Sequence, residues 1–436
     1  MGNRVHFVTL GCAKNEVDTD RMRANVLAHG FEVVDSIEQA DAVVLNTCSF
    51  LVSATEEGID YSFDILNDDF FIANNAKLVI TGCMPSRYGD ELEESLTEAH
   101  AFLAAEDEDS LPQLLSQLLD TSATKISDGA LRTVEGTSAY LKISEGCDRY
   151  CSFCAIPYIR GHYYSRSLDE LIQEAASLVD GGVRELVLVG QDTSVWGCDL
   201  EPKRSLSYLV QKVAENFPKT WIRVLYLQPE EVSDELIEVI ASHENVCNYF
   251  DIPMQHVNTR LLENMNRHGS AKEFLALIEK IRARFDGNVV IRSTFITGFP
   301  GESEEDFDEL CKFVEDAQLD YTGVFTYSAE EGTPAAEMED QIPEQVKLDR
   351  AQQIRDLGDS IGFAKASDMI GKEFEVLFEG YETDENGNDV PYGRWMGQAP
   401  DTDGIVRIYG DFDEPLVRVK AFDSICYDLD AEVLNG

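Results

Sequence analysis

Short apolar runs alternate with longer, mostly polar segments over the first hundred residues of the chain. The runs cover residues 4–11, 43–47 and 77–82 and are rich in Val, Leu, Ile and Thr. Strand-length runs separated by helix-length segments are typical of a parallel α/β sheet. The pattern therefore predicts an amino-terminal parallel α/β domain, which we place at residues 1–120.

A second alternation follows an acidic and polar stretch, which we assign to a linker at residues 121–136. A helix is predicted at 168–181, and six apolar runs are predicted as strands, at 139–144, 184–190, 222–228, 249–254, 288–298 and 321–328. Six parallel strands with intervening helices form an incomplete α/β barrel. With a further helical stretch at 343–366, this barrel is expected to occupy residues 137–366.

Short β runs broken by Gly, Asp and Pro fill the rest of the chain and predict a small β-barrel at residues 367–436. This part is acidic, because residues 369–436 hold 16 Asp and Glu against 5 Lys and Arg, a net charge of −11. The predicted fold class is α/β, with a parallel α/β domain, a partial (β/α)6 barrel and a carboxy-terminal β-barrel in that order.

The composition indicates a globular chain of two or three domains, because 436 residues that are 44% hydrophobic can build several cores. No long apolar stretch lies near the first residue, so neither a signal peptide nor a membrane span is expected and the predicted location is the cytoplasm. The formal net charge of −47 argues against broad electrostatic binding to nucleic acid. It suits either a basic partner or a well-solvated acidic surface.

Three cysteines form a C-x3-C-x2-C motif at Cys147, Cys151 and Cys154. Ordinary ferredoxin-type clusters take four cysteines, so three thiolates leave one iron of a [4Fe-4S] cluster open to bind a small molecule. The alternatives are a zinc site or three buried free cysteines. Zinc sites usually complete four ligands, and no histidine lies nearby before His162, so the iron–sulfur interpretation is favoured.

A second group of cysteines follows the three amino-terminal strands, with Cys12, Cys48 and Cys83 each placed directly after one of them. Ligands of open parallel sheets sit at the carboxyl ends of the strands, so the three thiolates are expected to converge on a second cluster with an open iron. The alternative is three isolated small residues at strand ends. The remaining cysteines lack partners at ligand spacing and are expected to be small buried hydrophobes: Cys198, Cys247, Cys311 and Cys426.

With these features the chain resembles the radical S-adenosylmethionine (SAM) methylthiotransferases over essentially its whole length. The segments T-L-G-C-A-K-N-E-V-D, C-S-F-C-A-I-P-Y-I-R-G, V-G-Q-D-T, I-P-M-Q-H and F-I-T-G-F-P-G-E are similar to the branch that modifies ribosomal protein uS12. The branch that modifies transfer RNA usually has tyrosine and asparagine where this chain has Leu10 and Asp192. Met254 stands where leucine is expected, a departure that conserves volume.

The resemblance implies an amino-terminal cluster domain, a radical SAM barrel and a terminal barrel of the TRAM type. It implies two [4Fe-4S] clusters and SAM as cofactors, with SAM bound at the open iron of the Cys147, Cys151 and Cys154 cluster and cleaved to a 5′-deoxyadenosyl radical. By the same resemblance, further SAM contacts are assigned to Phe153, Gln191, Gln255, Thr297, Gly298 and Phe299. Phe153 as simple loop packing and Gly298 as a simple turn are the alternatives for two of these.

The resemblance also implies that the second cluster carries the sulfur and that the product is a β-methylthio-aspartate in uS12. The expected partners are uS12 as a basic protein substrate, an electron donor and a sulfur source, with no membrane and no nucleic acid as direct substrate. Methylthiolation of a transfer RNA adenosine is the first alternative function. The second is an electron-transfer protein with two clusters, which is disfavoured because electron carriers normally saturate every iron with protein ligands.

Overall fold

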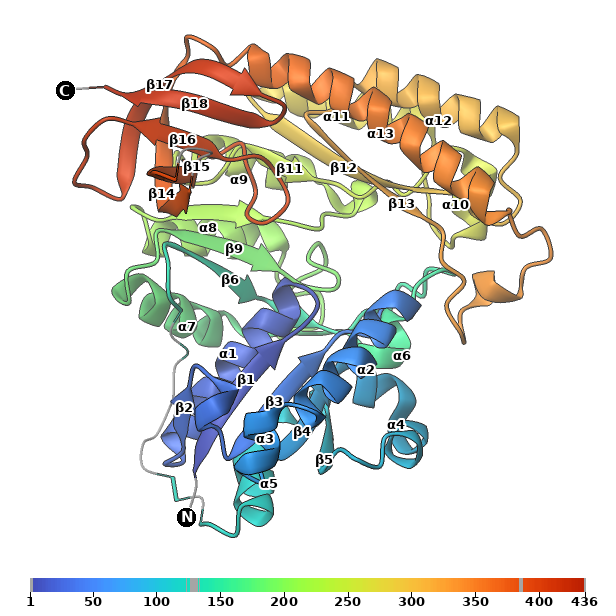
Figure 1. The fold of residues 1–436 in the computed structure, drawn as a ribbon. Helices are drawn as coiled ribbons and strands as arrows, with labels where there is room; N and C mark the ends of the chain where they lie inside the picture. Colours follow the sequence, from blue (N-terminus) through green and yellow to red (C-terminus); the bar gives the residue numbers. More distant parts are fainter. Residues whose placement is uncertain (1–2, 123, 126–131, 133, 384–386, 435–436) are drawn as a thin grey trace.

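The computed structural model of the chain describes residues 3–122, 124–125, 132, 134–383 and 387–434 (Figure 1). The amino-terminal domain lies at one end, the open barrel follows it, and the carboxy-terminal barrel lies at the far end, so the two chain termini are well separated. Residues 123, 126–131 and 133 of the predicted linker lie outside the described residues. The described helices include none with the length and apolarity that a membrane span needs.

The amino-terminal domain is a five-stranded parallel sheet in the order β2-β1-β3-β4-β5. Its strands are β1 (Arg4–Thr9), β2 (Glu32–Val34), β3 (Ala42–Thr47), β4 (Lys77–Gly82) and β5 (Ala101–Ala104). Its helices are α1 (Ala13–Ala28), α2 (Val52–Leu66), α3 (Asp69–Ala73), α4 (Cys83–Ser95) and α5 (Leu111–Leu118). The three predicted strands are confirmed. The sequence did not predict the two outer strands, β2 and β5, because runs of three and four residues are too short to show a clear hydrophobic pattern.

The six predicted barrel strands are confirmed as two three-stranded parallel sheets, β10-β9-β6 and β11-β12-β13. An isolated parallel bridge between Ile222 and Val246 joins the two sheets. The strands are β6 (Ser138–Lys142), β9 (Glu185–Val189), β10 (Trp221–Val224), β11 (Tyr249–Asp251), β12 (Val290–Thr297) and β13 (Tyr321–Thr326). The sheet bends into a partial barrel that stays open between β6 and β13, as Figure 1 shows.

Helices cover the outside of this barrel. They are α7 (Leu168–Asp180), α8 (Leu206–Asn216), α9 (Asp234–Ser242), α10 (Thr259–Asn264), α11 (Ala271–Arg284), α12 (Glu304–Ala317) and α13 (Glu344–Ser367). Two of them begin with a capping box, Ser167 with Glu170 in α7 and Ser303 with Asp306 in α12. In a capping box each side chain satisfies a backbone N–H that the helix leaves unpaired, which fixes where the helix begins.

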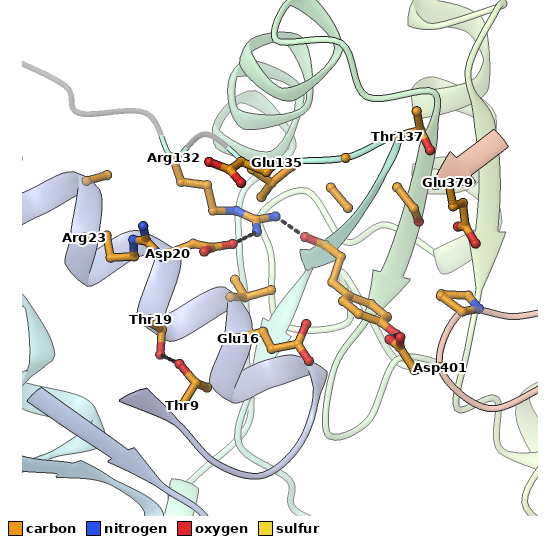
Figure 2. A pocket seen from close by; sticks show the side chains of 18 of the residues that line it. Thr9, Glu16, Thr19, Asp20, Arg23, Arg132, Glu135, Thr137, Glu379 and Asp401 are labelled. Atoms are coloured by element: carbon orange, nitrogen blue, oxygen red, sulfur yellow. Dashed lines mark hydrogen bonds and ion pairs between the residues drawn. The ribbon is translucent and has the colours of Figure 1, made fainter. Parts of the chain in front are cut away.

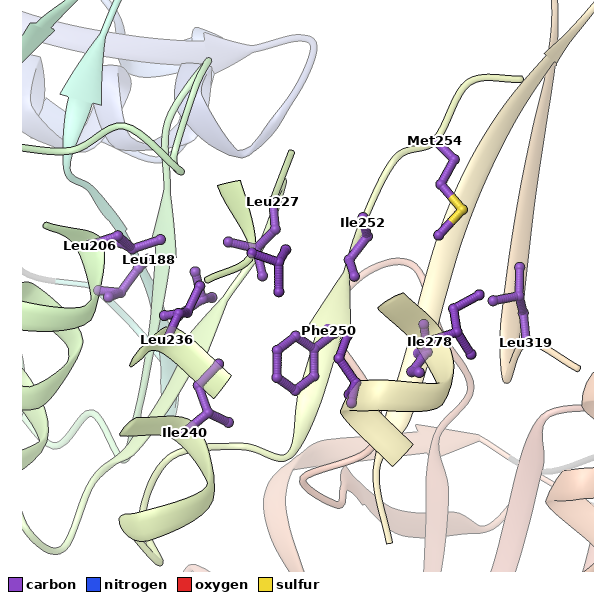
Figure 3. Packing of buried hydrophobic residues seen from close by; sticks show 14 of the residues in the cluster. Leu188, Leu206, Leu227, Leu236, Ile240, Phe250, Ile252, Met254, Ile278 and Leu319 are labelled. Atoms are coloured by element: carbon purple, nitrogen blue, oxygen red, sulfur yellow. The ribbon is translucent and has the colours of Figure 1, made fainter. Parts of the chain in front are cut away.

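The largest hydrophobic core fills the space between the barrel strands and their helices (Figure 3). Leu188 of β9 and Phe250 of β11 lie in it beside Leu236 of α9 and Ile278 of α11. Burying each such side chain contributes about 1.5–3 kcal/mol. Met254, which stands where leucine was expected, is fully buried in the same core. A hydrophobic side chain of similar volume therefore fills this position.

The carboxy-terminal unit is a closed five-stranded barrel in the order β14-β15-β16-β18-β17. This confirms the predicted small β-barrel. Its strands are β14 (Glu373–Thr383), β15 (Asp389–Arg394), β16 (Val406–Tyr409), β17 (Leu416–Ile425) and β18 (Asp428–Val433). Its interior is aliphatic, with Val376, Val419 and Leu429 buried at the centre.

A buried ion-pair cluster joins this barrel to the open barrel. Glu185 of β9 accepts a hydrogen bond from Arg223 Nε (2.7 Å) and pairs with Arg394 of β15. The side chains of Glu185 and Arg223 are 0% exposed and that of Arg394 is 3% exposed. Burial opposes ionisation of Glu185, but the two arginines outweigh it and lower its pKa to about 2. The cluster therefore fixes the terminal barrel against β9 and β10.

We predict that Glu185→Gln lowers the free energy of unfolding by about 3–5 kcal/mol, because it leaves Arg223 buried without a carboxylate and leaves Arg394 with Glu379 as its remaining partner. Urea denaturation measures the loss. The wild-type protein should lose this stabilisation as pH falls from about 4.5 toward 2, because the carboxylate is ionised in the folded state over that range and protonates in the unfolded chain. Glu238→Gln, which breaks an exposed pair with Arg284, is the control and should change stability little. Equal stability of the two variants would contradict the argument.

Candidate active site

The predicted ligands of the second cluster meet at one edge of the amino-terminal sheet. Cys12 follows β1 and precedes α1, Cys48 follows β3, and Cys83 is the first residue of α4, directly after β4. Strands β1, β3 and β4 are parallel neighbours, so their carboxyl ends lie side by side. A Cβ atom on Gly11 would lie 2.6 Å from Cys48 Cβ. The glycine, with φ 104°, thus lets the loop of Cys12 approach Cys48 closely.

Two of these thiols interact directly. The interaction of the Cys48 thiol with Cys83, together with burial, raises the pKa of Cys48. The same interaction lowers the pKa of Cys83, helped by Arg160 and opposed by burial. A thiol with a lowered pKa more readily becomes the thiolate, which is the form that binds metal. The assignment of the three cysteines as cluster ligands stays a prediction.

The C-x3-C-x2-C loop lies at the carboxyl end of the first barrel strand, between β7 (Ser144–Glu145) and α6 (Ile156–Arg160). The Cys154 N–H donates to the Cys151 carbonyl oxygen (3.0 Å), which curls the loop tightly. Burial raises the pKa of Cys147 to about 11 and that of Cys154 to about 12. Both are neutral thiols that a binding metal would have to deprotonate.

The cysteine triads do not form the compact ligand set of a single ion. Among the residues that the structure describes, no three His, Cys, Asp or Glu side chains are grouped to hold one metal ion. Structural zinc needs four ligands around one centre, whereas the thiolates of a [4Fe-4S] cluster bind separate irons at its corners and lie further apart. The donor chemistry, all sulfur and three per site, fits such a cluster with one iron open.

Helix α6 brings the two triads close together. It begins two residues after Cys154, and its last residue, Arg160, donates from Nη2 to Cys83 Sγ (3.2 Å). Cys83 also packs against Ile159 of the same helix. Arg160 Nη1 pairs with Asp18 of α1 (2.7 Å). A segment of the barrel thus contacts a predicted cluster ligand of the amino-terminal domain.

A buried polar network extends from this contact into the barrel. Lys142, the last residue of β6, pairs with Asp18 and with Glu145, and Gln191 donates a hydrogen bond to Glu145. Burial would keep Asp18 neutral, but Lys142 and Arg160 outweigh it and lower its pKa to about 2. The predicted SAM contact Gln191 is therefore linked through this network to the amino-terminal domain.

Buried polar atoms without partners gather at the carboxyl ends of β9 and β10. They are Gln191 Oε1, Asp192 Oδ1, Thr193 Oγ1 and Gln228 Oε1. Buried polar groups are almost always hydrogen-bonded in folded proteins, so four unpaired atoms at neighbouring strand ends indicate a site for a polar ligand. This fits SAM, and Asp192, Thr193 and Gln228 were not singled out as SAM contacts from the sequence.

The polar groups of three other predicted SAM contacts are occupied by partners within the protein. The N–H groups of Gly298 and Phe299 both donate to Glu302 Oε2 (2.7 and 3.3 Å). A Cβ atom on Gly298 would lie 2.2 Å from Lys347 Cγ, so the glycine makes room for that lysine. Thr297 Oγ1 donates to the Lys347 carbonyl oxygen (3.3 Å). The role of these residues as SAM contacts therefore rests on the resemblance alone.

The last two predicted contacts lie on separate parts of the barrel. Phe153 is half-buried and packs against the barrel core, which agrees equally with simple loop packing. Gln255 follows β11 with φ 68°, and its N–H donates to the Thr294 carbonyl oxygen of β12 (2.9 Å). Both stay predictions.

All ten cysteines are free thiols, but their burial differs from expectation. Of the four without ligand spacing, Cys247 is buried and Cys311 is half-buried. Cys198 and Cys426 are exposed, so the prediction of buried hydrophobes was wrong for these two. Each lies in a turn outside the cores, and Cys426 has φ 58° between β17 and β18.

A cavity of about 1170 Å³ lies between the amino-terminal domain, the open barrel and the terminal barrel. Figure 2 shows it between α1, the start of β6 and the loop that holds Asp401. Arg132 pairs there with Asp20 (3.0 Å), and Thr9 donates to Thr19 (2.7 Å). No cysteine lines this cavity, so we place the active site at the strand ends instead.

Comparison with known proteins agrees with this geometry. Residues 141–314 match the radical SAM superfamily, and residues 4–104 match the uncharacterized protein family UPF0004. The ribosomal protein uS12 methylthiotransferase RimO of Aquifex aeolicus is 40% identical, covering 99% of this chain and 98% of its own. That of Trichlorobacter lovleyi is 39% identical with the same coverage. The chain belongs to the RimO family.

Membership of the RimO family confirms the resemblance to radical SAM methylthiotransferases and to the uS12 branch. It also implies a [4Fe-4S] cluster and SAM as cofactors. The radical SAM methyltransferase TsrM from Kitasatospora setae has the same fold over 77% of each chain, with a TM-score of 0.58 and 15% identity. Neither the transfer RNA alternative nor the electron-transfer alternative is favoured by these relatives.

We predict that replacing Cys12, Cys48 and Cys83 together with alanine removes about half of the bound iron, because two separate triads hold two separate clusters. Cleavage of SAM should survive in this variant and disappear when Cys147, Cys151 and Cys154 are replaced instead. Iron analysis and detection of 5′-deoxyadenosine after anaerobic reconstitution measure both effects. A double variant of the exposed Cys198 and Cys426 is the control and should keep all its iron. Full iron content in the first variant would refute the second site.

Proposed function

We propose that this protein attaches a methylthio group to the β-carbon of an aspartate in ribosomal protein uS12, using SAM and two [4Fe-4S] clusters. The juxtaposition of two cysteine triads across α6, through Arg160 and Cys83 (3.2 Å), carries the proposal. One triad suffices to cleave SAM, whereas transfer of sulfur requires a second site close to the reacting carbon. The full-length relationship to uS12 methylthiotransferases supports the choice of substrate.

In this proposal Cys147, Cys151 and Cys154 hold the cluster at which SAM binds, and the amino-terminal triad holds the second. When bound, the two clusters supply the electron that cleaves SAM and the sulfur that is transferred. A C–H bond of the substrate breaks and a C–S bond forms, the hydrogen leaves on 5′-deoxyadenosine, and the methyl group comes from a second SAM. An electron donor and a sulfur source are therefore required partners, and the cytoplasm is the proposed location.

The residues around the clusters orient the reactants and keep water out. The unpaired oxygens of Gln191 and Gln228 at the strand ends are suited to receive the donor groups of SAM. Arg160 and Asp18, both nearly fully buried, close the gap between the two domains on one side. Positioned groups of this kind lower the barrier by holding the reacting atoms in line.

The acidic carboxy-terminal barrel is proposed as the surface that attracts basic uS12. Its arginines are occupied by acidic neighbours, since Arg407 pairs with Glu382 and Asp428, and Arg418 pairs with Glu373. The loop between β16 and β17 exposes Asp411, Asp413 and Glu414. Such complementarity governs the rate of encounter and the choice of partner, and it disfavours transfer RNA as the alternative substrate.

Mass spectrometry of uS12 and of transfer RNA from cells lacking this protein tests the function. We expect uS12 to lose one methylthio group on an aspartate and transfer RNA modification to stay unchanged. Restoring the wild-type gene should restore the modification, whereas a gene with the Cys12, Cys48 and Cys83 alanine substitutions should not. Loss of a methylthio group from transfer RNA instead would refute the proposal.

We predict that a variant with Asp411→Asn, Asp413→Asn and Glu414→Gln binds uS12 about tenfold more weakly, at roughly 0.5 kcal/mol for each exposed charge pair lost. The affinity of the wild type should fall as salt rises, and that of the variant should fall less. Point substitutions are preferable to deletion of the barrel, because deletion would leave Glu185 buried without Arg394.

The matched control neutralises three exposed acidic residues of α4, which lies at the opposite end of the molecule in Figure 1: Glu91, Glu93 and Glu94. Both variants remove the same charge, so a specific effect should appear with the barrel variant alone. Equal weakening by both would show that net charge, and not this loop, attracts uS12. Isothermal titration with purified uS12 at several salt concentrations distinguishes the two results.

A further inference from the structure

Lys14 makes no ion pair with the described residues and lies beside the proposed cluster ligand Cys12. It is the second residue of α1 and lies two residues after Cys12. Its ammonium group is 3.7 Å from the centroid of the Tyr226 ring. The described part of the chain supplies neither an ion pair nor a hydrogen bond to this group. Lys14 as a whole is half-buried.

Three other cations of the proposed site are occupied by carboxylates. Lys142 pairs with Asp18 and Glu145, Arg160 pairs with Asp18, and Arg149 pairs with Asp192. Each of these groups is neutralised inside the protein and has no charge to offer a substrate. Lys14 therefore differs from them in having its positive charge uncompensated by a paired carboxylate.

Tyr226 is held in an unusual conformation beneath this ammonium group. It follows β10 with φ 62°, a left-handed backbone that is uncommon for a bulky residue and often found at functional sites. Its N–H donates to Asp251 Oδ2 (2.9 Å), and the other oxygen of Asp251 accepts from Arg292 (2.9 Å). Asp251 is thus occupied and does not pair with Lys14. The ring face attracts the ammonium and leaves its N–H donors free.

We propose that Lys14 binds the side-chain carboxylate of the substrate aspartate and that Tyr226 positions its ammonium group; this rests on the proposed function. A carboxylate moved from water into a partly buried site needs a cationic partner. The carboxyl carbon is bonded directly to the β-carbon, so a carboxylate held by Lys14 brings the β-carbon beside the triad that includes Cys12. A neutral adenine base would gain no such pairing, which makes Lys14 a residue that determines specificity.

The test is a double-mutant cycle between enzyme and substrate, measured as binding to the anaerobically reconstituted holoenzyme. The enzyme is wild type or Lys14→Gln, and the uS12 protein carries either its modified aspartate or asparagine there. We expect Lys14→Gln to weaken binding of the aspartate form about tenfold or more, since bonds to charged groups are strong. It should leave binding of the asparagine form nearly unchanged. Lys14→Arg should retain most of the affinity.

Matched controls separate this role from a structural one. Arg21→Met removes one exposed positive charge from the same helix and should weaken both forms of uS12 equally or not at all. Iron content of each variant shows whether the site is intact. If the Lys14→Gln variant does not bind iron, binding of the two uS12 forms to the wild-type enzyme is compared instead. The asparagine form should bind about tenfold more weakly than the aspartate form.

Equal loss with both forms of uS12 would overturn the inference and leave Lys14 as a contact between domains. The same holds if the wild-type enzyme binds both forms equally well. In either case wild-type enzyme would still modify uS12, so the proposed function would stand. If the wild-type enzyme neither binds nor modifies uS12, the proposed function fails and the role of Lys14 fails with it.

Discussion

The ion pair between Asp18 and Arg160 joins the two domains that carry the cysteine triads. Asp18 comes from α1, Arg160 from α6, and their side chains are 2% and 3% exposed. Burying two charges costs several kcal/mol for each, and their attraction offsets this only when the geometry is good and further hydrogen bonds are made. Arg160 also contacts Cys83 and Asp18 also pairs with Lys142. A displaced domain would lose several of these contacts at once, so the pair selects one docking position.

The longer strands and the cysteines placed directly after them follow from local rules, which is why the sequence predicts them. Cys12, Cys48 and Cys83 each end an apolar run, and parallel strands align their carboxyl ends. The contacts of Lys14 and Arg160 join residues that are far apart in the chain, and no local pattern encodes them. The exposure of Cys198 and the packing of Gly298 on Lys347 depend equally on tertiary structure. Only a three-dimensional structure reveals such partners.

The acidity of the chain is concentrated on its surface. Arginines such as Arg223, Arg394 and Arg132 are buried and pair with acidic residues inside the protein or between its units. These internal pairs neutralise one another, so the formal charge of −47 resides almost entirely on exposed side chains. Like charges on a surface repel one another, and dissolved salt screens this repulsion. A surface with this charge favours solubility and repels polyanions.

The contact of Lys14 with Tyr226 places the boundary between two folding units inside the proposed catalytic centre. Lys14 and Cys12 come from the amino-terminal domain, while Tyr226 and the C-x3-C-x2-C loop come from the barrel. Neither unit contains both cysteine triads, so the proposed centre requires both units in their docked position. A change in how the two domains dock would therefore alter the proposed centre even if each domain kept its own fold.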